Sequence, residues 1–181
     1  TLCRTSQQQI TSQQWPSVLY LVWLQPVYIR SQNSLVVIPM EIRKALIPIS
    51  EGKRSGRKIT ASTLTIHSTD NPNSSAQNER DWLVNPDNHR AASWHVCVDQ
   101  REAVMAIPLD ERALHAGGKQ GNDTSLSLEI CESGDREQTL RNAVNVTAGL
   151  LQDRDWGVDK LRQHHDWSGK NCPRILRDTG R

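Results

Sequence analysis

The chain has 181 residues, of which 36% are hydrophobic, and this suits one compact domain with a real core. Its formal net charge of +2 is too small to indicate a nucleic-acid partner. The apolar run from Val18 to Ile29 is interrupted by Gln25 and Pro26 and is too short to span a bilayer, so we expect no membrane span. The same run makes an unconvincing signal peptide, because only Arg4 precedes it and no small-x-small cleavage site follows.

Residues 1–39 differ in composition from the rest of the chain. No acidic residue precedes Glu41, and only Arg4 and Arg30 of the 22 Lys and Arg lie in this part, so the remaining 20 balance all 20 Asp and Glu. Met40 lies where the composition changes. We therefore expect residues 1–39 to be an atypical extension, disordered or not native, and residues 40–181 to form the functional domain.

The domain is predicted to begin with a polar, Gly-punctuated lead-in over residues 41–62. Residues 63–67 then alternate between apolar and polar side chains, which predicts a strand that ends at His67. Residues 74–77 fit a capping box that opens a helix running to about Val84.

Two further strands are predicted over residues 94–99 and 103–108, joined as a hairpin. The connecting Gln100–Arg101 lacks the Gly or Asn that hairpin turns usually carry, so the turn type stays open. Residues 117–122 are predicted to form a flexible loop, and they lack the strand–GxxxxGK[S/T]–helix pattern of a phosphate loop.

Residues 125–131 alternate again and place Glu129 on the polar face of a strand. Asp135 with Gln138 is predicted to cap the next helix. The apolar stripe of that helix is expected to comprise Leu140, Ala143, Val144, Thr147, Ala148 and Leu151. Strands and helices interleave while the hairpin is antiparallel, which predicts a single α/β domain with a central mixed β-sheet flanked by helices.

The stretch 163–173 gathers side chains that bind metals. His164 and Cys172 flank a turn at Ser168–Gly169, and His67 is our candidate for a third ligand. Imidazole and thiolate suit zinc, and three protein ligands leave a fourth position for water, as in catalytic sites. The adjacent histidines 164 and 165 point apart, so only one of them is expected to bind the ion.

Each of these residues also has an ordinary interpretation. His67 fits a core histidine at a strand end, and Cys172 fits a buried thiol, since no CxxC or HExxH pattern supports a metal. A structural zinc would need a fourth ligand, for which Cys131, His165 and Asp166 are available.

Two charged residues are candidates for catalysis. Glu129 fits a general base that takes a proton from attacking water, or a solvated glutamate on an edge strand. Lys170 fits a group that stabilises an oxyanion, or a surface lysine. A Ser-His-Asp hydrolase is disfavoured because no G-x-S-x-G turn is present. A thiol protease using Cys172 fits the residue types, although Pro173 removes the next backbone N–H, a usual contributor to an oxyanion hole.

Seven short blocks of sequence occur in an order that is characteristic of one enzyme family. They are residues 66–69, 92–96, 107–109, 114–117, 121–125, 128–131 and 164–173, reading IHST, ASWHV, IPL, LHAG, GNDTS, LEIC and HHDWSGKNCP. Together the blocks, spread over about residues 40 to 177, resemble the zinc-dependent N-acetylmuramoyl-L-alanine amidases of type 2. This family includes phage endolysins and bacterial autolysins and is related to the peptidoglycan recognition proteins.

The resemblance implies a role for each matching residue. One Zn²⁺ per domain would be held by His67, His164 and Cys172, which selects His164 over its neighbour. Glu129 and Lys170 would be catalytic, and substrate would lie against His115 and Trp94, the latter replacing a Tyr that is common in the family.

The implied reaction is hydrolysis of the amide between N-acetylmuramic acid and L-alanine in peptidoglycan, with zinc polarising the carbonyl and Glu129 transferring the proton. The chain would act as a monomer at the bacterial cell wall, either secreted or released by a phage. A non-catalytic peptidoglycan-binding module on the same fold is the main alternative, and a cysteine peptidase is another.

Overall fold

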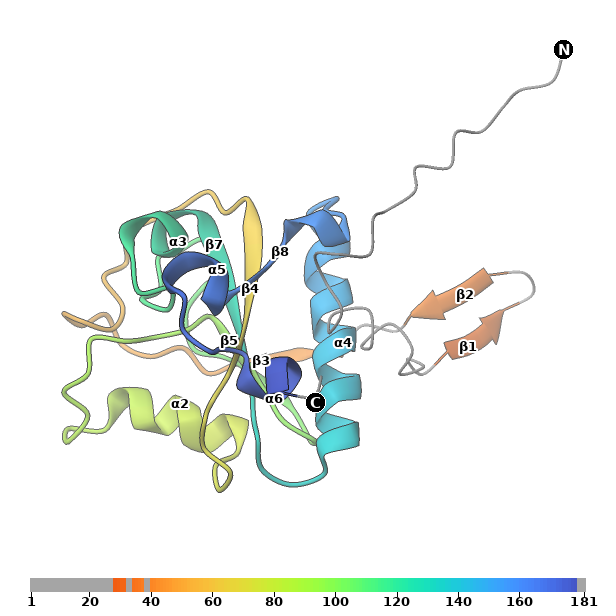
Figure 1. The fold of residues 1–181 in the computed structure, drawn as a ribbon, viewed down its shortest axis with the longest axis horizontal. Coiled ribbons are helices and arrows are strands. Elements are labelled where there is room, and N and C mark those ends of the chain that lie inside the picture. Colours follow the sequence, from red (N-terminus) through yellow and green to blue (C-terminus); the bar gives the residue numbers. More distant parts are fainter. Residues whose placement is uncertain (1–27, 32–33, 38–39, 179–181) are drawn as a thin grey trace, which may run out of the picture.

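A computed structural model describes residues 28–31, 34–37 and 40–178 of the chain (Figure 1). Its centre is a six-stranded sheet in the order β3-β6-β5-β7-β4-β8. The strands are β3 (Ile42–Lys44), β4 (Thr63–Ser68), β5 (Val96–Val98), β6 (Ala103–Met105), β7 (Ser125–Ile130) and β8 (Leu161–Gln163). Within this sheet only β5 and β6 pair antiparallel, and every other neighbouring pair is parallel. The predicted mixed sheet is confirmed.

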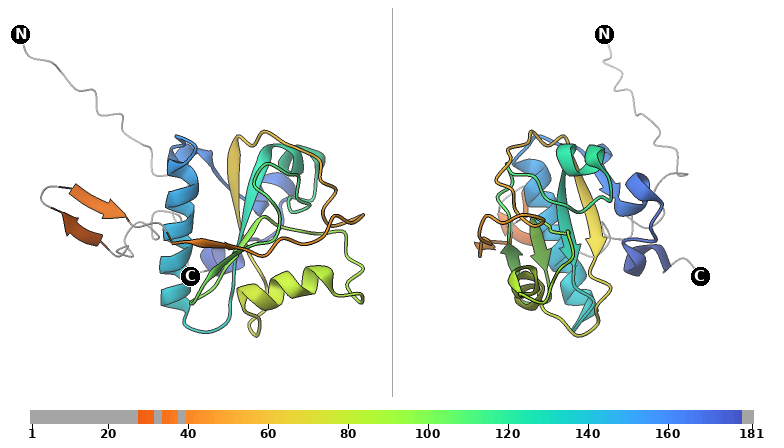
Figure 2. Two further views of the ribbon diagram at one scale, coloured as in Figure 1. Left: turned by 180° about the vertical axis from the view of Figure 1, so that it is seen from behind. Right: turned by 90° about the vertical axis from the view of Figure 1, so that its left-hand side faces the viewer.

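Helices cover both faces of this sheet (Figure 2). They are α2 (Ala76–Val84), α3 (Lys119–Thr124), α4 (Arg136–Gln152), α5 (His164–Ser168) and α6 (Arg174–Arg177), with a 3₁₀ turn at Val158–Lys160. The long helix α4 lies along one face, while α2 and α5 lie on the other. No helix in the described residues is both long and apolar enough to cross a membrane.

The core has two layers because the sheet is buried on both faces. On the α4 side, Leu64 and Ile66 pack with Leu126, Leu128 and side chains of α4. On the opposite side, apolar side chains of β5 and β6 pack with α2 through Ala76, Leu83, Cys97 and Val104. Central parallel strands are normally covered in this way, and all six residues of β4 are buried.

Helix α4 begins as predicted, with the Asp135 side chain accepting a hydrogen bond from the Gln138 N–H. The predicted apolar stripe, however, is rotated from the face that is buried. The buried residues are Thr139, Asn142, Ala143, Val146, Leu150 and Leu151. Two polar residues of this face are accommodated because both are hydrogen-bonded: Thr139 donates to Asp135 O and Asn142 donates to Asp99 O.

Three other local predictions are corrected by the structure. The lead-in contains strand β3, which forms the sheet edge against β6. Residues 117–122 are not simply a loop, since α3 begins at Lys119. The cap of α2 is Ser75, whose hydroxyl accepts from the Asn78 N–H.

The hairpin between β5 and β6 turns without glycine because Asp99 supplies the missing interactions. One carboxylate oxygen of Asp99 accepts from the N–H groups of Arg101 and Glu102, at 2.7 and 2.9 Å. The other oxygen accepts from the first N–H of α2, at Ala76. One buried side chain therefore fixes both the turn and the start of the helix.

Before the domain, β1 (Tyr28–Ser31) and β2 (Ser34–Val37) pair antiparallel as a separate two-stranded sheet. The rest of the predicted extension, including Cys3, lies outside the described residues. The division at residue 40 stays a prediction.

A buried ion pair holds the segment between β3 and β4 to the domain. Arg54 donates to both carboxylate oxygens of Glu111, at 2.7 and 3.0 Å, and to the carbonyl of Ile47. The side chains of Arg54 and Glu111 are only 14% and 7% exposed. The pKa of Glu111 is lowered mainly by its hydrogen bonds from Arg54.

Replacing Arg54 by Ala is expected to lower the free energy of unfolding by about 3 kcal/mol, because it leaves the Glu111 carboxylate buried without its main partner. The loss should be fully present above about pH 5 and should shrink as the pH falls through the lowered pKa of Glu111, where the carboxyl becomes neutral in both proteins. Urea unfolding of both proteins at several pH values measures this loss in the free energy of unfolding. Arg141→Ala is the control, since Arg141 pairs with Glu137, whose side chain is 62% exposed, and its loss should change little. Equal losses at pH 3 and pH 7 would contradict this explanation.

Candidate functional site

The register of the parallel strands brings His67 and Glu129 together. The two residues are direct partners across β4 and β7, and Glu129 is in turn the partner of Cys97 on β5. All three lie on the sheet face opposite α4, because their neighbours along each strand pack against that helix. His67 Nδ1 lies 3.9 Å from Glu129 Oε1.

Strand β8 delivers His164 to the same place. Gln163 pairs with Ile66, so His164 follows abreast of His67 as α5 begins. The helix starts with a capping box in which the Gln163 N–H donates to Asp166 at 2.8 Å. It ends at Gly169, whose φ of +74° is a left-handed conformation that glycine adopts without strain.

The turn after Gly169 brings Cys172 back under α5. The His165 N–H donates to the Cys172 carbonyl, at 3.1 Å. On the far side of the cysteine, Arg174 pairs with Glu132 and Asp70, and its N–H donates to the Ser68 hydroxyl. Cys172 is therefore held against the end of β4 from both directions.

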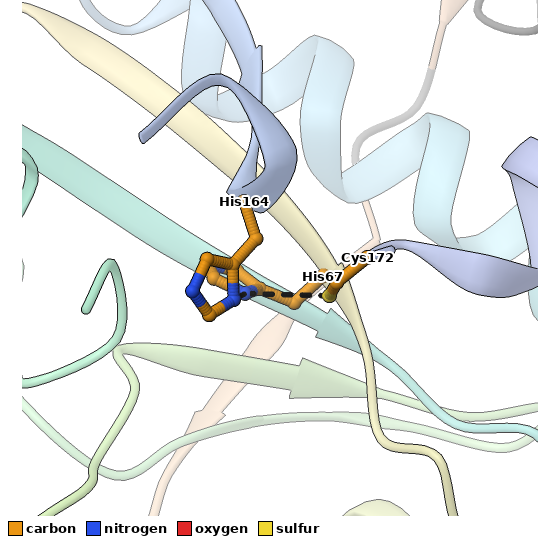
Figure 3. Close-up of side chains that lie close together, drawn as sticks. All are labelled: His67, His164 and Cys172. Carbon is orange, nitrogen blue, oxygen red and sulfur yellow. Dashed lines mark hydrogen bonds between the residues drawn. The ribbon is translucent and has the colours of Figure 1, made fainter. Parts of the chain in front are cut away.

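Three ligand atoms converge where these segments meet (Figure 3). His67 Nδ1 lies 3.2 Å from His164 Nδ1 and 3.7 Å from Cys172 Sγ, and all three atoms lie within 4.8 Å of one another. Nitrogen and sulfur ligands on a tetrahedral zinc are about 3.3 to 3.8 Å apart, given the usual bond lengths. The donor set and its two short separations therefore fit a zinc ion with three protein ligands.

Residues that the sequence offered as other ligands lie elsewhere. Within the described residues, the cluster comprises only His67, His164 and Cys172. His165 contributes its backbone N–H to the turn, and the Cys131 sulfur lies 3.5 Å from that of Cys97 in the core. Cys97, Cys131 and Cys172 are buried free thiols.

Burial determines the protonation of the cluster. It lowers the pKa of His67 well below its usual range and lowers that of His164, so both imidazoles are neutral and offer lone pairs. It raises the pKa of the Cys172 thiol to about 11 and that of Glu129 to about 8, the latter aided by the charge of Glu79. A carboxyl with a pKa near neutrality is suited to proton transfer.

The cluster opens into a hollow of about 300 Å³. Lys170 is exposed and lines the hollow together with Glu129. Trp94 and His115 also line it, but they are only 6% and 7% exposed, and the His115 ring contacts His67 directly. Residues that the sequence analysis did not single out also line the hollow, among them Asp70, Glu79, Trp82, Asn88 and Arg90. Glu79 and Trp82 lie on α2 and the other three in the loops on either side of it, where the sequence carries no chemical pattern that would have identified them.

Helix α5 is fixed to the sheet through Trp167. Its indole N–H donates to the Thr65 hydroxyl at 2.9 Å, and that oxygen also contacts the Ser125 hydroxyl at 2.7 Å. The indole ring packs over Gly121 in α3, where a Cβ would lie 2.9 Å from Trp167 Cδ2 and closer still to Ala116. A side chain at residue 121 would therefore displace the helix that carries His164.

Gly121→Ala is expected to lower the free energy of unfolding by roughly 1 to 3 kcal/mol through overpacking against Ala116 and Trp167. Gly118→Ala is the matched control, because no heavy atom lies within 4 Å of its new Cβ and its φ of −153° suits any residue. Thermal or urea unfolding distinguishes the two. Equal stability of both variants would show that the contact between α3 and α5 is loose.

Comparison with known proteins identifies the relatives of the chain. A family model described as N-acetylmuramoyl-L-alanine amidase matches residues 56–175. The chain is 36% identical over 143 residues to the amidase XlyB of Bacillus subtilis, covering 74% of this chain and 44% of that protein. It is 35% identical over 150 residues to CwlA of the same species, covering 78% of this chain and 54% of CwlA. The chain thus spans about half the length of these curated relatives.

Solved structures agree with this assignment. The catalytic domain of XlyA superposes with a TM-score of 0.71 at 34% identity, covering 77% of this chain and 94% of that domain. PlyL superposes with a TM-score of 0.69, also at 34% identity, covering 78% of this chain and 92% of that structure.

Proposed function

The chain belongs to the N-acetylmuramoyl-L-alanine amidase family, and from this we propose that it hydrolyses the amide between N-acetylmuramic acid and L-alanine in peptidoglycan, in a zinc-dependent reaction. The observation that carries the zinc dependence is the convergence of two neutral imidazoles and one thiol at the floor of an open hollow. Two of the three separations among these atoms match those of tetrahedral zinc ligands.

We propose that His67, His164 and Cys172 hold the ion. A zinc ion bound there would act as a Lewis acid, polarising the scissile carbonyl and making water nucleophilic at neutral pH. The three residues come from separately anchored segments: the end of β4, the start of α5 and the turn after Gly169. The Cys172 thiolate would replace the thiol on binding, with release of its proton.

The proposed catalytic residues are Glu129 and Lys170. Glu129 takes the proton of the attacking water as the new C–O bond forms, and it delivers that proton to the alanine nitrogen as the C–N bond breaks. Its position beside His67 and its raised pKa, about 8, suit both transfers. The Lys170 ammonium lies at the rim of the same hollow, where it can stabilise the negative charge that develops on the carbonyl oxygen.

Substrate is proposed to lie in the hollow above the cluster, against Trp94 and the neighbouring wall. Groups of both charges line the hollow, the carboxylates of Asp70 and Glu79 and the cationic groups of Arg90 and Lys170, which suits a muramyl peptide that carries amide, hydroxyl and carboxylate groups. The chain would act on peptidoglycan as a monomer at the bacterial cell wall, where enzymes of this family work.

Two alternatives are less well supported. A binding module on the same fold has no need for a complete set of zinc ligands next to a carboxyl of raised pKa. A cysteine peptidase needs a reactive thiolate, whereas burial raises the pKa of Cys172 to about 11.

Removing zinc with a chelator, or replacing His67 by Ala, is expected to abolish lysis of purified cell walls, because the polarising ion is lost. Added Zn²⁺ should restore the chelated protein but not His67→Ala. The products should contain new amino groups of alanine without new reducing sugar ends. His89→Ala is the control, since His89 is exposed and lies outside the cluster and the hollow. Full activity of a metal-free preparation would refute zinc dependence, and new reducing ends would refute the amide as the bond that is cut.

Glu129→Gln is expected to lower the rate of wall hydrolysis by about 10²- to 10⁴-fold, because the amide cannot transfer the proton. Zinc affinity should stay close to that of the unsubstituted chain, since Glu129 is not among the three ligands. Glu137→Gln, on the exposed side of α4, serves as the control and should remain fully active. An active Glu129→Gln variant would assign the proton transfer to another group.

A further inference from the structure

His115 makes contacts that a residue in the wall of a substrate groove would not need. The residue is 7% exposed, and its ring stands edge-on to the ring of His67, with the two centroids 5.1 Å apart. Its Nδ1 lies 3.1 Å from His67 Nε2, and its Nε2 lies 3.1 Å from the Ser125 carbonyl oxygen. Both ring nitrogens are therefore engaged inside the protein.

The direction of these two hydrogen bonds follows from the last acceptor in the series, the Ser125 carbonyl oxygen. A carbonyl oxygen can only accept, so His115 Nε2 must carry the proton that it donates to Ser125 O. A neutral imidazole has one N–H, so His115 Nδ1 is an acceptor. The hydrogen bond between the two histidines then requires His67 Nε2 to be the donor.

These two hydrogen bonds, from His67 to His115 and from His115 to the Ser125 carbonyl, form a relay that fixes the tautomer of His67. With its proton on Nε2, the lone pair of His67 is on Nδ1, the atom that lies 3.2 Å from His164 Nδ1 and 3.7 Å from Cys172 Sγ. The opposite tautomer would direct an N–H into the cluster and would leave two lone pairs facing each other between His67 and His115. A metal ion needs the first arrangement.

The position of His115 is itself secured by two neighbouring contacts. The side-chain oxygen of Asn122 accepts from the N–H groups of His115 and Ala116, both at 2.8 Å. The Ser125 hydroxyl bonds to Thr65, which also receives the indole N–H of Trp167. The acceptor of the relay thus belongs to the same network that holds α5 in place.

We infer that His115 is a positioning residue, which accepts a hydrogen bond from His67 and so directs the His67 Nδ1 lone pair at the proposed metal position. This inference rests on the proposed zinc dependence. It differs from the role in substrate contact that the resemblance implied for His115. Partners of this kind orient a ligand and raise its basicity, and their loss typically costs 10- to 100-fold in metal affinity.

The first test reads the tautomers directly. Nitrogen-15 NMR of the imidazole rings, on the unsubstituted full chain with and without zinc, should show His115 and His67 both protonated at Nε2 and not at Nδ1. Assignment of the His115 proton to Nδ1 would overturn the inference, whatever the outcome for activity.

The second test measures zinc affinity by competition with a chelator. His115→Leu is expected to bind zinc about 10 to 100 times more weakly than the unsubstituted chain. His115→Gln should retain the affinity, because its amide oxygen can accept from His67 while its NH₂ donates to Ser125 O. The visible absorption spectra of the cobalt-substituted proteins should show the same difference. The spectrum of the Leu variant should differ from that of the unsubstituted chain, and the spectrum of the Gln variant should match it.

The matched control is His95→Gln. His95 is fully buried, and its ring centroid lies 6.0 Å from that of His115, but its nitrogens bond to Ser127 and to the Glu111 carbonyl. Its loss should lower stability without changing zinc affinity. If His95→Gln weakens zinc binding as much as His115→Leu does, the effect is one of packing and the inference fails.

The outcomes separate this inference from the proposed function. If the unsubstituted chain binds no zinc, the proposed function fails, and the NMR result alone decides the direction of the relay. If it binds zinc and His115→Leu binds equally well, the inference fails while the zinc-dependent reaction stands. If His115→Leu does not fold, the folded His115→Gln variant takes its place. A loss of zinc affinity in that variant would count against the inference, and an unchanged zinc affinity would count in its favour.

Discussion

The parallel pairing of β4 with β7 on one side and β8 on the other is the constraint on which the site depends. In a parallel sheet, residues in register point to the same face, so His67, Glu129 and the residue that follows Gln163 are placed side by side by backbone hydrogen bonds alone. A slip of one residue in the β4–β7 pairing would turn His67 or Glu129 toward α4 and into the apolar layer, and a slip in the β4–β8 pairing would move His164 out of line with His67. The buried Leu and Ile side chains in that layer fix the register of the strands. They therefore determine the geometry of the site as well as the packing of the core.

The second requirement is that Cys172, which belongs to no strand, reach the same point. Several polar contacts accomplish this: the turn at Gly169, the His165 N–H on the Cys172 carbonyl, and the pairs of Arg174 with Asp70 and Glu132. The acidic partners of Arg174 follow β4 and β7, the two strands that carry His67 and Glu129. The segment that bears the Cys172 thiol is thus held to the two strands that carry His67 and Glu129.

The sequence predicted the elements whose pattern is local and periodic. Alternation identified β4 and β7, and the capping residue Asp135 located the start of α4. It did not predict β3, which is three residues long. It also did not predict α3, whose six residues lack a helical pattern and which is held by Trp167 packing on Gly121 and by the hydrogen bonds of Asn122 with His115 and Ala116. The buried face of α4 was missed because the pairing partners of Thr139 and Asn142 cannot be read from spacing. The ligand set was expected from the resemblance, whereas the contact between His67 and His115 depends on a fold that no motif describes.

The distances along the chain between the clustered residues have a consequence for folding. His67 and His164 are 97 residues apart, and His67 and Cys172 are 105 apart. Closing such long loops costs conformational entropy before any contact stabilises them, and topologies dominated by remote pairings fold slowly. The cluster cannot exist in a nascent chain until residue 172 has been synthesised and β8 has paired with β4. A metal-competent cluster is therefore a property of the completed domain, and its formation reports that the last long-range pairing has been made.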